Sequence, residues 1–216
     1  MSLNFNIFSF VFAVLAGILG FAAVIIISIN YKHYVASVKK NALYFMLALA
    51  LFSAALLMHS LHIFTANEAY DSIAHLAEVL AFSIVSVSSL AALKVAKEYG
   101  FGAGILGLMS GLAAAEATHI FLVTAGFISA ALSFYAWRKF AKDNWGAIYF
   151  QSFLFRILLT IGYSLSLGEH FSGNANWEIS GNFIILMAFV LILFTAIKLK
   201  TMTENVVVAA VNIKQQ

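Results

Sequence analysis

The chain has 216 residues, of which 63% are hydrophobic and only 10% are charged, and its formal net charge is +3. Soluble domains carry about 45–50% apolar and about 25% charged residues, so this composition excludes an ordinary soluble domain and predicts an integral membrane protein. The sequence contains no cysteine, which excludes disulfides and thiolate metal ligands.

Seven apolar segments are long enough to cross a bilayer as helices, which takes about 20 residues. In chain order they are 5–30, 42–64, 72–94, 101–121, 122–140, 147–168 and 179–197. The fourth and fifth are contiguous, and as one helix they would measure about 60 Å, twice the hydrocarbon thickness. We therefore expect a tight turn between Glu116 and Thr124. The predicted fold class is all-α: a polytopic membrane protein with seven transmembrane helices in one domain, 1–200, and a short cytoplasmic tail, 201–216.

Most basic residues follow the first, third, fifth and seventh segments, so seven spans place them all on one side of the membrane. They are Lys32, Lys39, Lys40, Lys94, Lys97, Arg138, Lys139, Lys142, Lys198 and Lys200. Because basic loops stay in the cytoplasm, we expect the N-terminus outside and the C-terminus inside, in a multi-pass protein of the plasma membrane. Expected partners are membrane lipid and either other membrane subunits or further copies of the chain; nucleic acid is not expected.

An internal similarity suggests helical-hairpin repeats. Segment 50–64, "ALFSAALLMHSLHIF", shares five identities with segment 107–121, "GLMSGLAAAEATHIF", and in that alignment His62 matches His119 and Glu116 stands opposite His59. Repeats are common in membrane transporters, although apolar sequence also produces chance matches.

Histidines and carboxylates gather at the outer ends of four predicted spans. Residues three apart are neighbours on a helix, so the second, third and fourth spans each present their pair on one face, and Glu169 and His170 end the sixth. The candidate metal ligands are His59, His62, His75, Glu78, Glu116, His119 and His170, with Glu169 nearby. Imidazole and carboxylate ligands suit Zn, Fe or Cu, and Glu-x-x-His pairs build di-metal sites in helix bundles. The alternative is that each histidine bonds only a backbone carbonyl and a serine.

The charge on this side favours a bare metal ion over haem b. It carries the acids Glu68, Asp71, Glu78, Glu116, Glu169 and Glu178 and no lysine or arginine. Such a surface attracts cations and repels anions, including haem propionates.

The sixth span carries a continuous polar face that includes Arg156, about 15 Å in from its cytoplasmic end. A cation at that depth is expensive, so we expect it either to hold an anionic group or to reach back to Asp143 or the lipid phosphates.

The sequence therefore predicts an outward-facing His/Glu transition-metal site with hydrolytic or redox chemistry, or the metal-binding membrane subunit of such an enzyme. The candidate catalytic residues are Glu78, Glu116 and Arg156. An unligated carboxylate would act as the base for metal-bound water, and Arg156 would hold an anionic group deeper in the pocket. The alternatives are a divalent metal-ion transporter, and a b-type haem or non-catalytic membrane subunit of a respiratory or oxidase complex.

Overall fold

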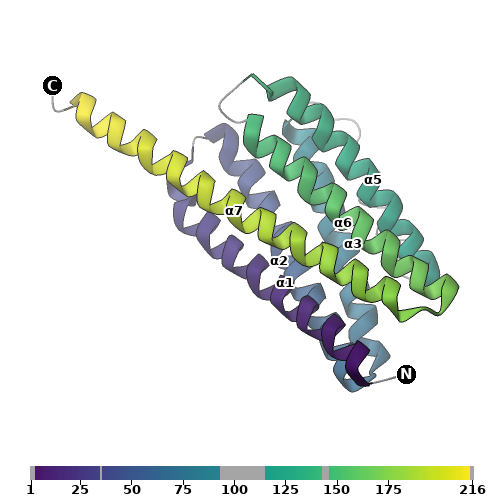
Figure 1. Ribbon diagram of the computed structural model, residues 1–216. Helices are drawn as coiled ribbons and strands as arrows, with labels where there is room; N and C mark the ends of the chain where they lie inside the picture. Colours follow the sequence, from purple (N-terminus) through teal and green to yellow (C-terminus); the bar gives the residue numbers. More distant parts are fainter. Residues whose placement is uncertain (1–2, 35, 93–114, 143–145, 215–216) are drawn as a thin grey trace.

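The computed structural model describes residues 3–34, 36–92, 115–142 and 146–214, and within them the chain is a bundle of long helices without strands (Figure 1). In chain order these are α1 (Leu3–Asn30), the short 3₁₀ helix η1 (Tyr31–His33), α2 (Ala36–Thr65), α3 (Glu68–Ala92), α5 (Ala115–Phe140), α6 (Gly146–Ser172) and α7 (Ala175–Lys214). The all-helical class is confirmed.

Six of the described helices are long and apolar enough to cross a membrane. Large apolar side chains are exposed on the outside of the bundle, among them Ile25 on α1, Phe127 on α5 and Phe194 on α7. Exposed apolar surface of this extent is unfavourable in water and favourable against lipid. The prediction of a multi-pass membrane protein is therefore confirmed at the level of six candidate spans.

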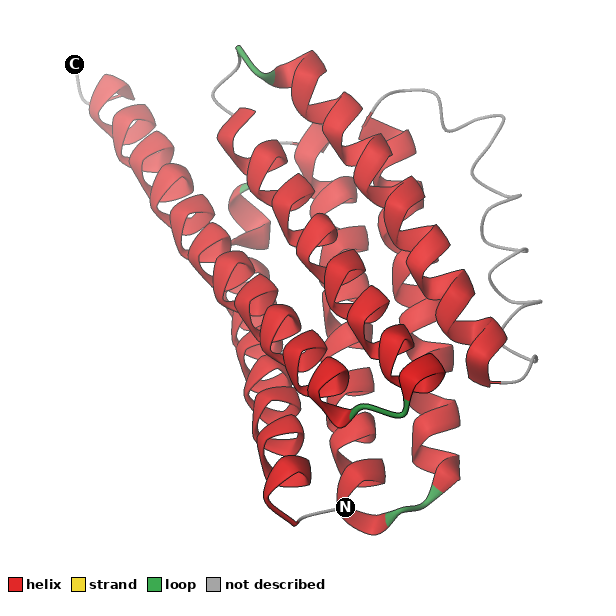
Figure 2. Ribbon diagram, turned by 45° about the vertical axis from the view of Figure 1, so that its right-hand side comes forward, coloured by secondary structure: helices red, strands yellow, loops and turns green. Residues whose placement is uncertain are grey.

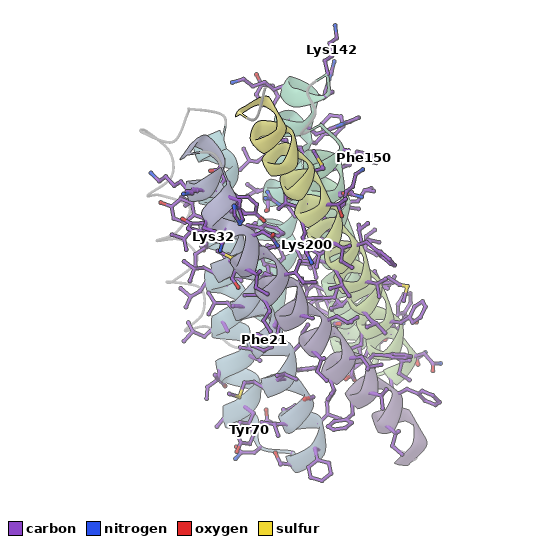
Figure 3. All side chains as sticks on the ribbon, turned by 90° about the vertical axis from the view of Figure 1, so that its left-hand side faces the viewer. Phe21, Lys32, Tyr70, Lys142, Phe150 and Lys200 are labelled. Carbon is purple, nitrogen blue, oxygen red and sulfur yellow. The ribbon has the colours of Figure 1, made fainter. Side chains whose placement is uncertain are left out.

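The helices form a closed ring. Each packs against its neighbours along the chain, α3 packs against α5, and α7 returns to pack against α1 (Figures 1 and 2). The α2–α3 and α6–α7 connections lie at one end of the ring, and the α1–α2 and α5–α6 connections at the other. Figure 3 shows this separation: Tyr70, just after the α2–α3 connection, lies far from Lys142, just after α5.

The predicted segments 5–30, 42–64, 147–168 and 179–197 all lie within helices, and 72–94 matches α3 as far as Ala92. Most of the predicted fourth span, 101–121, lies outside the described residues. Residues 201–214, predicted as a tail, continue α7, which extends past the other helices (Figure 1).

The predicted turn between Glu116 and Thr124 is wrong, because α5 runs unbroken from Ala115 to Phe140. The length of an apolar run requires a break somewhere within it but does not locate one. Without proline or a glycine pair, the stretch 115–124 has nothing to end a helix.

Helices α6 and α7 pack closely where Gly162 faces Gly181. A methyl group at position 181 would lie 2.7 Å from the Gly162 carbonyl oxygen and 2.7 Å from Ser166 Oγ. Small residues allow such backbone contact between membrane helices. The two glycines therefore allow the backbones of α6 and α7 to approach closely.

We predict that Gly181→Ala destabilises the protein by about 1–3 kcal/mol, because the added methyl meets backbone that cannot rotate away. The measurement is thermal unfolding in detergent, followed by circular dichroism. Gly168→Ala is the matched control on the same helix pair, since its methyl would lie 3.5 Å from Trp177, an ordinary contact. Both variants gain the same helix propensity, so equal stability would contradict the close-contact assignment.

Candidate functional site

Two tight connections bring polar side chains from α2, α3, α6 and α7 to one end of the bundle. Between α2 and α3, Ala66 adopts a φ of 55° and its N–H donates to the His62 carbonyl. Between α6 and α7, Gly173 has a φ of 63° and donates to the Glu169 carbonyl, as glycine commonly does after a helix end. Such short links hold the last turn of one helix beside the first turn of the next.

A cavity of about 360 Å³ opens between these four helices. Its polar lining residues are His59, His62, Glu68, Asp71, His75, Glu78, Tyr163, Ser166, Glu169, Glu178 and Asn182. Among the lining residues that the structure describes there are five carboxylates, three imidazoles and no lysine or arginine. The cavity therefore favours cations.

Asp71 is the shared partner of two histidines on different helices. Nδ1 of His59, from α2, donates to Asp71 Oδ1 at 3.1 Å, and Nε2 of His75, from α3, lies 3.3 Å from Asp71 Oδ2. Nε2 of His59 faces Glu178 on α7 at 3.9 Å. One carboxylate thus links the walls of the cavity.

His75 and Glu78 form a buried pair at the base of the cavity, with exposed fractions of 8% and 3%. His75 Nδ1 donates to Glu78 Oε2 at 3.1 Å, and the Tyr163 hydroxyl of α6 donates to Glu78 Oε1 at 2.8 Å. A carboxylate that accepts from Nδ1 orients the ring and directs Nε2 toward a ligand position. Here Nε2 points to Asp71.

His62, Glu68 and Asp71 form the candidate metal group at the cavity mouth. Each offers one ligand atom, and all three atoms lie within 4.8 Å of one another. His62 Nδ1 donates to the Asn67 carbonyl at 3.2 Å, and this hydrogen bond leaves the lone pair on Nε2. A ring fixed in this way can bind a metal.

Four buried aromatic rings pack together deeper in the bundle than the cavity: Phe52, Phe82, Phe155 and Phe189. Three of them lie seven or eight residues further in than His59, Tyr163 and Asn182, which is about 10–12 Å along a helix. The Phe52 and Phe82 centroids are 4.8 Å apart, and those of Phe155 and Phe189 are 5.6 Å apart. This layer is called here the aromatic floor.

The structure brings His59, His62, His75 and Glu78 together in the cavity and leaves Arg156 out of it. Arg156 is 4% exposed, and its Nη1 donates to the carbonyl and hydroxyl oxygens of Ser129 on α5, at 3.0 and 3.3 Å. It lies about two helical turns below Tyr163, near the aromatic floor.

The remaining predicted residues are described only by their backbone. Glu116 and His119 lie in the first turns of α5, at the cavity end, and His170 lies near the end of α6. The side chains of these three lie outside the described residues.

Sequence reasoning did not assign ligand roles to Glu68, Asp71, Glu178 and Asn182, or connect Tyr163 with Glu78. A signal for part of this set was present on α3. Glu68, Asp71, His75 and Glu78 follow one another at spacings of three, four and three, which places them on one helix face.

No family model, curated protein or solved structure matches this chain. Its function is therefore argued from the cavity alone.

We predict that Tyr163→Phe lowers the free energy of unfolding by about 1 kcal/mol, because Glu78 loses a buried hydrogen-bond donor. Reversible unfolding in mixed micelles measures the change. Tyr135→Phe is the control, since Tyr135 is 63% exposed and its loss of a hydroxyl should be neutral. An equal effect of the two substitutions would contradict the Tyr163–Glu78 bond.

Proposed function

We propose that the protein is a metal-dependent integral membrane protein whose site opens on the outer face of the membrane. The observation that supports this best is the convergence of His62, Glu68 and Asp71 within 4.8 Å at the mouth of a cation-attracting cavity. Three protein ligands leave coordination positions open toward the cavity, as in catalytic rather than structural metal sites.

The ligand atoms limit which metal ions would bind at this site. One imidazole and two carboxylates suit Zn²⁺, Fe²⁺ or Mn²⁺ and are poor ligands for Cu⁺, which prefers sulfur. Of the metals expected from sequence, Zn and Fe therefore fit these ligands better than Cu⁺.

The chemistry that fits best is activation of a metal-bound water, because such an ion lowers the pKa of water to about 7. Glu78 is the candidate base, since it is buried, lines the cavity and is held by Tyr163 and His75. Redox chemistry at iron would use the same ligands. Arg156 does not line the cavity, so we assign it no contact with a substrate there.

The alternatives are less well supported. Transport needs a path through the bundle, and the aromatic floor lies across it. A b-type haem would place its propionates among five carboxylates without a lysine or arginine in the described lining. A transporter would load metal into proteoliposomes, and a haem protein would show a Soret band.

Charge asymmetry supports the proposed orientation. Among the described residues, Lys32 follows α1, Lys40 begins α2 and Lys139 ends α5, all at the end opposite the cavity. Under the positive-inside rule this end is cytoplasmic, and the cavity faces outward. An N-terminus outside agrees with this placement, because α1 ends beside Lys32 at the basic end and therefore begins at the cavity end.

We predict that protein purified without chelator carries at least one transition-metal ion per chain, measured by elemental analysis. The double variant His62→Ala, Glu68→Gln should lose at least one equivalent, because only one ligand of the mouth group remains. His33→Ala is the control, since His33 is exposed and lies in η1 at the opposite end. A metal-free wild type would refute the proposal.

We further predict that the cavity end is labelled from outside the cell. The chain has no cysteine, so Asn67→Cys and Lys142→Cys each introduce a single exposed thiol at opposite ends. A membrane-impermeant maleimide should label Asn67→Cys in intact cells and Lys142→Cys only after permeabilisation. The reverse labelling pattern would contradict the proposed topology.

A further inference from the structure

We infer that the cavity is a dinuclear site in which Asp71 bridges two divalent ions. The outer ion would be held by His62 and Glu68, and the inner ion by Nε2 of His75, while His59 Nδ1 donates to the bridging carboxylate. This inference rests on the proposed metal-binding function and extends it from one ion to two.

The position of Asp71 supports a bridge. Its Oδ1 is engaged by His59 and its Oδ2 faces His75, while the same carboxylate belongs to the mouth group with His62 and Glu68. Three imidazoles and a second carboxylate therefore surround one carboxylate. Carboxylates with two available oxygens commonly span metal ions about 3.5–4 Å apart.

The His75 ring is positioned to bind a cation. Both ring nitrogens of His75 face carboxylates, Nδ1 at 3.1 Å from Glu78 and Nε2 at 3.3 Å from Asp71. A neutral imidazole donates through only one nitrogen, so with Nδ1 donating to Glu78 the lone pair of Nε2 is directed toward Asp71. A metal ion held by Nε2 and Asp71 would use this lone pair, and the Glu78–Tyr163 contact keeps the ring in place for it.

The charge of the lining agrees with two ions. Imidazoles bind metals in the neutral form, so the five lining carboxylates are then the only charged side chains among the described lining residues. One divalent ion balances two of their charges, and a second ion balances two more. Only one negative charge is then left over among the lining carboxylates.

Asn182 provides an independent indication of a ligand. It is 3% exposed, lines the cavity from α7, and its Nδ2 has no hydrogen-bond partner among the described residues. A buried amide donor is rarely left without an acceptor. An oxygen ligand of the inner ion, such as water, would supply that acceptor.

The test uses Mn²⁺ with full-length protein in detergent, measured by equilibrium dialysis and electron paramagnetic resonance. We expect two Mn²⁺ per chain and a spin-coupled spectrum, because a bridging carboxylate holds the ions close together. His75→Ala and His62→Ala should each retain one Mn²⁺ and show the hyperfine pattern of an isolated ion. His33→Ala should keep both ions and their coupling.

The outcomes separate the two proposals. One uncoupled Mn²⁺ in the wild type overturns the dinuclear site and leaves the metal-binding function standing. No bound Mn²⁺, together with a metal-free protein in elemental analysis, overturns both. The wild-type result alone decides, so a variant that fails to fold does not remove the test.

Discussion

The Asp71 carboxylate, shared between imidazoles of two helices, is the interaction on which the polar end of this bundle depends. Charged groups inside a membrane bundle are costly unless they are paired, and Asp71 is the point where the pairs from α2 and α3 meet. Glu178 extends the network to α7, and Tyr163 extends it to α6 through Glu78. Four helices are thereby joined by polar contacts at one end, while aromatic rings pack the middle.

Much of the fold follows from apolar segment length. The described helices contain six of the predicted segments in full or nearly in full, because a bilayer-spanning run of apolar residues without proline has few alternatives to a helix. Short connections also made it predictable that His59, His62, His75 and Glu78 reach the same end. The prediction of a turn between Glu116 and Thr124 was wrong. The length of the apolar run requires a break in the helix, but composition does not say where the break lies.

Side-chain partners were less predictable, because spacing does not fix the rotation of a helix about its axis. His59 and His62 are neighbours on α2 with ring centroids 6.2 Å apart, yet His59 bonds Asp71 and His62 bonds the Asn67 carbonyl. The turn at Ala66, whose N–H donates to the His62 carbonyl, places Asn67 and Asp71 beside these rings. Neither the role of Asp71 nor the buried amide of Asn182 can be read from one sequence.

The most direct test of a metal centre at Asp71 is anomalous diffraction from crystals grown with Zn²⁺ and collected at the zinc absorption edge. We predict an anomalous peak within about 2.0–2.2 Å of ligand atoms of His62, Glu68 and Asp71, the usual zinc–ligand distance. An anomalous map without a peak in the cavity, in a structure where Asp71 is still hydrogen-bonded to His59, would contradict the proposed metal centre.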